Sequence, residues 1–430
     1  MKKFRSQIAS AIFSLAAGLV FSASAQNPTL PVIPDRTFTI TDYGAVGDGK
    51  TPATTAIQKT IDAAVAAGGG EVLVPAGKFL TGPFTLASSL NLHLAKDAVI
   101  LISDDRTTYP VARGRYVDSI TAADAHDLEI SGEGTIDGQG GSWWDAFRAD
   151  PGMTHRPYMI RLSNCQRVEV AGVTLQNSPM FHLVPQGCTD VTIQDVTIHS
   201  PGNAPNTDGI DPSGWNFLIT RCSIDTGDDN IAIKPNGGRQ PGNKNYLVTD
   251  CRFLRGHGMS VGGGTAGGLQ DLIVSNCTFN GTDAGIRIKT LRGNGGRLQN
   301  VTYENLSMNA VKNPIYIIDW YPERNAPKDP ASETPQPVGP RTPFNRDIVI
   351  LDVTVTDSPN AGIIRGLPEA PITNVLLTNV NISAETGMNI YFAKDIKFAA
   401  SQITVQKGKN LTTFNAQVEG LDTSETAEKN

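Results

Sequence analysis

The sequence predicts an all-β protein, a right-handed parallel β-helix with a capping helix at its N-terminal end. The first observation is composition, because 43 of the 430 residues are glycine and only 18% are charged. Disordered proteins carry more charge, and coiled coils draw half of their residues from a helix-favouring set. The second observation is a short pattern of alternating apolar residues that recurs along most of the chain. The third is that these repeats almost lack helical periodicity.

The repeats are clearest in FLITRCSI from Phe217, YLVTDCRF from Tyr246 and LIVSNCTF from Leu272. Alignment places one residue of each repeat at an equivalent position: Val173, Val196, Cys222, Cys251, Cys277, Leu306, Val353 and Val380. Successive positions are 23 to 29 residues apart, except for one step of 47. Such a period indicates a solenoid of short strands. Parallel stacking of its coils gives a right-handed β-helix, because parallel crossovers are right-handed.

Three of the five cysteines share this register position, where other coils carry Val or Leu. We therefore expect Cys222, Cys251 and Cys277 to point inward as reduced thiols that pack like small apolar side chains. No cysteine pair and no His/Cys cluster has the spacing of a zinc site, so we expect neither a structural metal nor a cofactor.

Both ends of the repeat array have features of solenoid ends. Residues 54–67 predict an amphipathic helix with Ile57, Ile61, Ala64 and Val65 on one stripe. Such a helix would cover the strand edges that a solenoid exposes at its end. The step of 47 residues contains a proline-rich insertion, 320–345, which is expected to form a loop beside the coils. No linker divides the chain, so we expect one domain over residues 26–430.

The first 25 residues indicate a secretory signal. Three basic residues precede an apolar run from Ile8 to Phe21, and an A-x-A cleavage pattern ends at Ala25. The run is shorter than the ~20 residues of a membrane span, so we expect cleavage and export to the extracellular space or periplasm, not membrane anchoring. The remaining 36 − 3 = 33 basic residues against 42 acidic ones give a charge of −9. This acidic balance argues against a general nucleic-acid binder.

Four segments with reactive side chains follow one another in consecutive coils: NTDGID from Asn206, DTGDDNIAIK from Asp225, GHGMSV from Gly256 and GIRIKT from Gly285. Each runs from a turn into a short apolar strand. Alignment of these strands places Asp208, Asp229 and His257 two residues before one common position. Because coils stack ~4.8 Å apart, the three side chains should form a row at one corner, with Asp228 beside them.

This corner combines carboxylates with cations. Strand alternation points Arg287 and Lys289 outward on the same face. Neighbouring carboxylates cannot all ionise cheaply, so at least one pKa should rise, which suits a general acid. Inverting glycosidases separate acid and base by ~6.5–9.5 Å, a distance that Asp208 and Asp228 could span. A Ca²⁺ site is the alternative, since Ca²⁺ prefers oxygen ligands in turns, although the adjacent cations oppose a dication.

Together and in this order, NTDGID, DTGDDNIAIK, GHGMSVGG and RIKT resemble the four signature blocks of the polygalacturonases, glycoside hydrolase family 28. The likeness runs from DYGAVGDG at Asp42 to about Asp395 and is strongest to bacterial secreted endo-polygalacturonases. It implies a β-helix that hydrolyses α-1,4-galacturonosyl bonds of pectin with inversion and without a metal. The implied partner is a polyanionic polysaccharide, homogalacturonan or pectin. Exo attack, or a rhamnogalacturonan or xylogalacturonan backbone, are alternatives within the family, and we expect a monomer.

Carried over residue by residue, the catalytic positions of the family fall on Asp208, Asp228, Asp229 and His257. Asp228 matches the acid that protonates the leaving oxygen, and the other two aspartates match the pair that positions and activates water. The histidine matches one that supports the ionisation state of the acid or contacts the substrate. Substrate-binding positions fall on Asn206, Arg287 and Lys289, of which the two cations would grip uronate carboxylates.

Several nearby residues have an ordinary structural interpretation: Asp211 and Asp225 as turn or strand-end residues, His182 as a satisfied buried histidine, Lys234 as a solvated lysine, and Trp143-Trp144 and Trp320-Tyr321 as buried loop aromatics. The aromatic pairs could instead stack on sugar rings. For Lys234, a position beside the carboxylates is an alternative of equal weight.

Two other classes of function remain. A glycan-binding β-helix would not need all three aspartates, and a pectate lyase would use Ca²⁺ and an arginine base.

Overall fold

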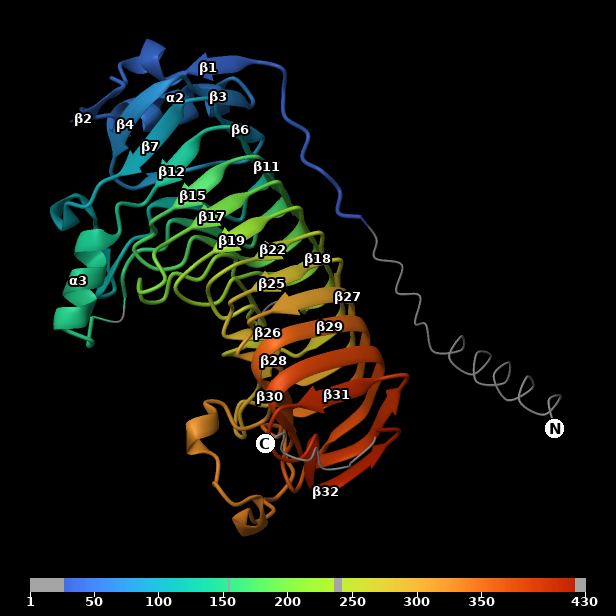
Figure 1. The fold of residues 1–430 in the computed structure, drawn as a ribbon. Helices are drawn as coiled ribbons and strands as arrows, with labels where there is room; N and C mark the ends of the chain where they lie inside the picture. Colours follow the sequence, from blue (N-terminus) through green and yellow to red (C-terminus); the bar gives the residue numbers. More distant parts are fainter. Residues whose placement is uncertain (1–26, 154, 236–241, 422–430) are drawn as a thin grey trace, which may run out of the picture.

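The computed structural model describes residues 27–153, 155–235 and 242–421, which form one long coil of β-strands (Figure 1). Pairing joins thirty strands of these residues into a single sheet in which the partners are parallel. The prediction of a right-handed parallel β-helix is confirmed. The secretory signal expected over residues 1–25 lies outside the described residues. Among the helices that are described, none is both long and apolar enough to cross a membrane.

The strands form three stacks along the coil axis, which we call A, B and C. Stack A consists of β1 (Thr37–Thr39), β3 (Gly70–Val74), β6 (Leu90–Leu94), β11 (His126–Gly132), β14 (Gln166–Ala171), β16 (Leu183–Gln194), β18 (Ser213–Thr220), β21 (Lys244–Thr249), β24 (Leu269–Ser275), β27 (Arg297–Asn309), β29 (Phe344–Arg365) and β30 (Ile372–Ala399). Stack B consists of β2 (Asp48–Pro52), β4 (Gly77–Thr81), β7 (Ala98–Ile102), β12 (Thr135–Asp137), β15 (Thr174–Gln176), β17 (Thr197–His199), β19 (Ser223–Asp225), β22 (Arg252–Phe253), β25 (Thr278–Asn280), later parts of β27, β29 and β30, and β31 (Gln402–Val405).

Stack C carries the predicted site. It consists of β5 (Phe84–Thr85), β10 (Ile120–Ala123), β13 (Ile160–Ser163), the start of β16, β20 (Ile231–Ile233), β23 (Met259–Gly262), β26 (Ala284–Lys289), β28 (Asn313–Ile318), the last parts of β29 and β30, and β32 (Leu411–Glu419). Between β16 and β20 a single residue, Ile210, continues the stack, since it bridges Leu183 on one side and Ile231 on the other.

The remaining elements are short and lie outside the stacks: α2 (Thr54–Ala66), α3 (Gly141–Ala149), the 3-10 helices η1 (Ile40–Tyr43), η2 (Arg106–Thr108), η3 (Glu323–Asn325) and η4 (Pro330–Ser332), and the hairpin of β8 (Val111–Ala112) with β9 (Arg115–Tyr116). Helix α2 covers the N-terminal end of the coil beside β1 and β3 (Figure 1), as predicted. The predicted apolar stripe was wrong at Val65, which is 45% exposed, because the helix buries Thr60 instead. The threonine hydroxyl donates to the Ala56 carbonyl, so the buried hydroxyl has a hydrogen-bond partner.

Buried apolar side chains from successive coils fill the interior of the β-helix. The predicted ladder of Cys222, Cys251 and Cys277 is confirmed, since each side chain is buried and none forms a disulfide. Cys165 and Cys188 are also buried and free. These thiols replace the Val or Leu of other coils without changing the packing.

Polar ladders run along the corners of the coil. At the start of stack A, residues with positive φ recur coil after coil, and most of them are Asn or Asp, which tolerate this conformation. Their side chains bond to the next coil, as Asn216 does to Asp190 and Asn245 Nδ2 to Asn216 Oδ1 at 2.6 Å. The Asn and Asp residues scattered through the repeats therefore fix the corners at which each coil bends.

The insertion 320–345 is a loop beside the coils, as predicted, and carries η3 and η4 (orange in Figure 1). Glu333 fastens it: its side chain is fully buried, pairs with Arg365, and accepts a hydrogen bond from Trp320 Nε1 at 2.7 Å. The loop is thus tied to the C-terminal coils next to the predicted site.

Candidate active site

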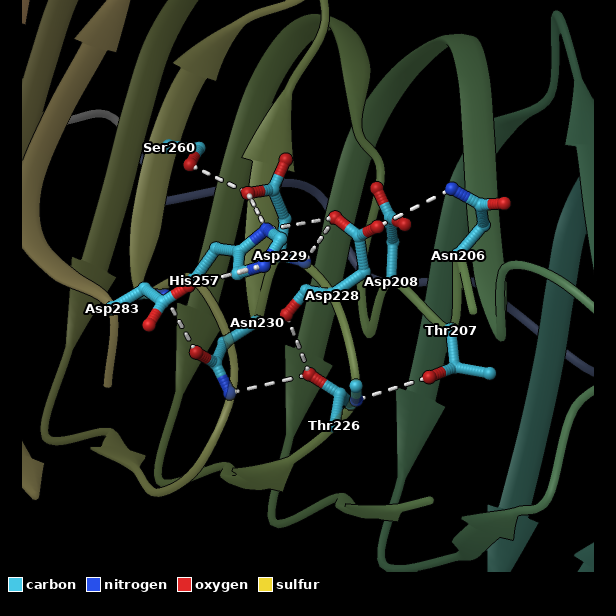
Figure 2. Close-up of polar contacts among 12 residues, drawn as sticks. Asn206, Thr207, Asp208, Thr226, Asp228, Asp229, Asn230, His257, Ser260 and Asp283 are labelled. Carbon is cyan, nitrogen blue, oxygen red and sulfur yellow. Dashed lines mark hydrogen bonds and ion pairs between the residues drawn. The ribbon is translucent and has the colours of Figure 1, made fainter. Parts of the chain in front are cut away.

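The predicted site residues lie in the turns that lead into the bridge residue Ile210, into β20 and into β23, and on the outer face of β26. The predicted register is confirmed, because Ile210 bridges Ile231, Ile231 pairs with Met259, and Met259 pairs with Ile286. Asp208, Asp229 and His257 each precede this row by two residues and therefore come from consecutive coils. Figure 2 shows them gathered on one face with Asp228 and Asn206.

Asp228 is the exposed member of the carboxylate cluster, with 22% of its side chain accessible, whereas Asp208 and Asp229 are 3% and 2% exposed. Its Oδ1 lies 3.1 Å from His257 Nδ1 and accepts the Asp229 backbone N–H at 2.8 Å. Its Oδ2 accepts from Asn206 Nδ2 at 3.3 Å. Burial acts to raise the pKa of Asp228, but the hydrogen bond from His257 and the positive charges of His257 and Lys289 together outweigh it, and the net pKa lies below its usual value.

His257 holds a proton between the carboxylates. Burial lowers its pKa, yet the hydrogen bonds to Asp228 and Asp229 raise it to about 9. Its Nε2 also lies 3.5 Å from the exposed Asp283. At neutral and mildly acidic pH the ring is therefore an imidazolium in contact with Asp228, the most accessible of the three clustered aspartates.

Asp229 is locked in the ionised form. Its Oδ1 accepts from Arg287 Nη1 at 2.6 Å and from Ser260 Oγ at 2.9 Å, and its Oδ2 accepts from Lys289 Nζ at 2.5 Å. Burial alone would raise the pKa of Asp229, but Lys289, His257 and Arg287 together lower it well below its usual value. The two predicted substrate-binding cations thus contact this carboxylate.

Asp208 is the carboxylate whose pKa rises. Burial raises the pKa of Asp208 well above its usual value, Lys234 opposes this, and Asp211 adds to it. Lys234 Nζ lies 2.9 Å from Asp208 Oδ2 and also pairs with Asp211. The pKa expected to rise was that of a general acid, matched to Asp228. The rise falls on Asp208 instead, because Asp208 lacks the imidazolium contact.

Asp211 directly follows the bridge residue Ile210, as expected of a strand-end residue, but it also contributes to the site. It is 3% exposed, lies in the same cluster, and burial raises its pKa to about 6. Asp208 and Asp211 each have a buried Oδ1 with no hydrogen-bond partner among the described residues. Lys234, for which two interpretations were open, lies beside these carboxylates. Asp225 is structural as expected and pairs with Arg255 at 2.7 Å.

Two further residues that the sequence did not single out hold the turns in place. Asn230 is fully buried, accepts the Gly258 N–H at 2.8 Å, and donates to the carbonyls of Ile224 and Arg255, so it ties the Asp228–Asp229 turn to the His257 turn. Gly258 has φ +77°, and a Cβ there would lie 1.8 Å from the Ala284 carbonyl oxygen. Only glycine fits this close approach of two coils.

Arg156 is a third unpredicted residue, and it comes from the loop that contains α3. It is 3% exposed, and its guanidinium donates to the carbonyls of Pro179 and Pro205 and to Asn206 Oδ1 at 2.7 Å. Because arginine only donates, it fixes the amide of Asn206 with Nδ2 directed toward Asp228. Burial lowers the pKa of Arg156 to about 10, so it stays charged.

The aromatic candidates separate into two groups. Trp143 and Trp144 are buried and cannot stack on a ligand. Tyr321 is half-buried and lies over both cations, with its ring centroid 5.7 Å from Arg287 Cζ and 5.3 Å from Lys289 Nζ. His182 is structural, as expected: it is fully buried, bonds the Asp208 carbonyl and Ser200 Oγ, and burial lowers its pKa to about 4.

A cation site is geometrically conceivable at this corner, since one ligand atom each from Asp228, Asp229 and His257 lies within 4.8 Å of the others. However, Arg287 and Lys289 already neutralise Asp229. A dication would have to displace these cations from Asp229 and the proton from His257. The residues present fit a carboxylate–imidazolium network better than a metal centre.

Comparisons with known proteins identify the family of the chain. The family model described as glycosyl hydrolases family 28 matches residues 66–401, and a model for rhamnogalacturonase A/epimerase, pectate lyase-like, matches residues 37–93. A probable polygalacturonase of Vitis vinifera is 32% identical over 370 residues, which cover 80% of this chain and 73% of the relative. An endo-polygalacturonase of Pectobacterium carotovorum is 30% identical over 407 residues, covering 88% and 96%.

Among solved structures, a hyperthermoactive exopolygalacturonase from Thermotoga maritima shares the fold. Its TM-score is 0.69 at 24% identity, and the match covers 93% of this chain and 95% of that one. A family model that spans most of the chain, two relatives at 30% identity or more, and the fold all agree. The chain belongs to glycoside hydrolase family 28.

Proposed function

We propose that this protein is a polygalacturonase, which hydrolyses the α-1,4-galacturonosyl bonds of pectin with inversion. The observation that carries the proposal is the cluster of Asp208, Asp228 and Asp229 beside Arg287 and Lys289 on one face of stack C. Carboxylates supply acid and base, and adjacent cations suit a substrate that carries a carboxylate on each sugar unit. The relatives named as polygalacturonases support the same substrate class.

Asp228 is the general acid in this proposal, because it is the only one of the three carboxylates that the groove exposes. The contact with His257 keeps its pKa below the usual value. A polyuronate chain laid over it would remove its remaining solvent and bring further negative charge, and both effects raise a carboxyl pKa. The proton that His257 holds 3.1 Å away is then available to Asp228, which passes it to the leaving oxygen.

Asp229 and Asp208 position and activate the attacking water. Asp229 stays ionised through its contacts with Arg287 and Lys289, so it can accept the proton of the water. Asp208 offers a buried Oδ1 without a hydrogen-bond partner among the described residues. Two carboxylates on the opposite side of the sugar from the acid give inversion, because one displacement occurs from one face.

Asn206, Arg287 and Lys289 bind the substrate in this proposal. A uronate carboxylate would share the two cations with Asp229, and the Tyr321 ring beside them offers a face for the sugar. We further propose that the protein is exported after cleavage near Ala25 and acts as a single catalytic domain over residues 26–430.

The test is incubation of the purified protein with polygalacturonate. Release of reducing ends without the ultraviolet absorbance of an unsaturated product supports hydrolysis, and NMR of the first anomer formed distinguishes inversion from retention. An unsaturated product would show a lyase, and no action on any pectic substrate would favour a binding protein. Early mixed oligomers would indicate internal attack, whereas monomer alone would indicate attack from an end.

A further inference from the structure

The outer face of stack C continues well beyond the catalytic cluster toward the N-terminal end. Its outward positions form one column, in the order Thr121, Arg161, Val184, Asp211, Ala232, Ser260, Arg287 and Tyr316. Arg161 thus occupies the same column as Arg287, five coils earlier. It lies three coils, or about 14 Å, from the coil that carries Asp229.

A row of cations and stacked rings joins Arg161 to the cluster. Lys234 Nζ, which pairs with Asp208, lies 3.9 Å from the centroid of the Phe181 ring. The Phe181 ring stacks on Tyr158 at 4.8 Å and 6°. Arg161 Cζ lies 6.0 Å from the Tyr158 centroid. Both rings are half-buried, so a sugar chain leaving the cluster in this direction meets aromatic surface and then a guanidinium.

Arg161 borders a hollow of about 590 Å³, which Arg115, Tyr116, Asp118 and Ser163 also line. Asp118 is the acidic residue that pairs with Arg161, but it also bonds to the backbone. Its Oδ2 is 3.4 Å from Arg161 Nη1, and its Oδ1 accepts the Tyr158 N–H at 2.8 Å. Arg161 Nη2 donates to Gln186, and Nε has no hydrogen-bond partner among the described residues.

The exposed fractions of Arg161 and Asp118 indicate whether Arg161 is only a structural ion-pair partner or can also bind a ligand. Both side chains line the hollow, but Arg161 is 39% exposed and Asp118 is 13% exposed, so Arg161 is the more accessible of the two to a ligand. With Arg115 exposed on the same rim, the hollow has two positive charges against one negative charge. An anionic ligand is therefore favoured there.

We propose that Arg161 and the Tyr158–Phe181 ring pair form a distal subsite that binds the carboxylate of a uronate unit about three sugar units from the bond that is cut. A sugar unit in an extended chain is roughly as long as one coil step, so three coils correspond to about three units. This inference rests on the proposed function, because its ligand is the same polyuronate chain.

The experiment compares substrate lengths in Arg161→Met. Trigalacturonate is too short to reach from the cluster to Arg161, whereas hexagalacturonate and polygalacturonate reach it. At about 0.15 M salt, where the Debye length is about 8 Å, the charge of Arg161 is screened from the cluster. We expect kcat/KM to fall about ten-fold on the long substrates, the effect of one charged hydrogen-bonding contact, with trigalacturonate unchanged.

Arg221→Met is the matched control, since Arg221 is 51% exposed, pairs with Asp195 and follows β18, away from the face of stack C. It should change neither activity. Arg161→Gln, which keeps a donor for Gln186, should show the same length-dependent loss, and retained activity on trigalacturonate shows that each variant is folded.

Equal losses on short and long substrates, or no loss on either, would overturn the subsite while the proposed function stands. If the wild-type protein hydrolyses no galacturonan of any length, the proposed function fails first and the subsite fails with it.

Discussion

Asp319 is a buried carboxyl group whose ionisation should set much of the pH dependence of stability. It follows β28, has no exposed surface, and accepts hydrogen bonds on Oδ1 from Thr290 of the previous coil and from Asn345 at the end of the insertion. Its Oδ2 has no partner among the described residues. The isosteric change Asp319→Asn keeps Oδ1 as an acceptor and removes only the ability to ionise.

Burial raises the pKa of Asp319 from 3.8 to about 7. Between these values the folded state binds a proton that the unfolded state has lost, so the free energy of unfolding falls as the pH rises. A difference of about three units corresponds to a loss of about 4 kcal/mol, complete above pH ~7. Asp319→Asn should therefore match the wild-type protein near pH 4 and be more stable by about 4 kcal/mol near pH 8.

The assay is denaturant and thermal unfolding of both proteins at several pH values between 4 and 8. Asp352→Asn serves as a control, because Asp352 is exposed and accepts a hydrogen bond from Asn379 on a corner of the coil. Parallel curves for Asp319→Asn and the wild-type protein across this range would refute the reasoning.

Three further predictions concern the site. Arg156→Met should lower kcat about ten-fold or more by releasing Asn206, and combination with Asn206→Ala should add little; additive losses in this double-mutant cycle would contradict the link. The wild-type kcat/KM should fall as the pH rises through about 9, the pKa of His257, whose proton passes to Asp228. His257→Gln should lower the rate and move this fall to lower pH, because Asp228 would then have to carry the proton itself; an unmoved profile would argue against the pair. A chelator should leave hydrolysis unchanged, and activity restored only by Ca²⁺ would overturn the metal-free mechanism.

The fold and the row of reactive residues could be predicted because they depend on a repeat. Once the strands are aligned, stacking fixes which residues share a row, and it places Arg287 and Lys289 on the same face as the aspartates, two coils after Asp229. The thiol ladder at Cys222, Cys251 and Cys277 follows in the same way.

Contacts made by irregular segments could not be predicted. Arg156 reaches Asn206 across 50 residues from a loop with no periodicity. Asp211 resembles an ordinary turn or strand-end aspartate in the sequence. Its pairing with Lys234 is indicated only by the register, which places Lys234 two coils before Lys289 on the same face. The direction of each pKa shift was equally hidden, since it depends on which carboxylate contacts His257 and which contacts Lys234.

The central claim is that Asp228 is the acid of a galacturonan hydrolase. The most direct measurement is kcat on polygalacturonate for Asp228→Asn, with binding of the polymer measured in parallel and Asp225→Asn, which removes a carboxylate paired with Arg255 outside the cluster, as the control. The predicted result is loss of nearly all hydrolysis by Asp228→Asn with binding retained, and full activity of the control. Retention of more than about a tenth of the wild-type kcat, a barrier change of only ~1.4 kcal/mol, would contradict the assignment.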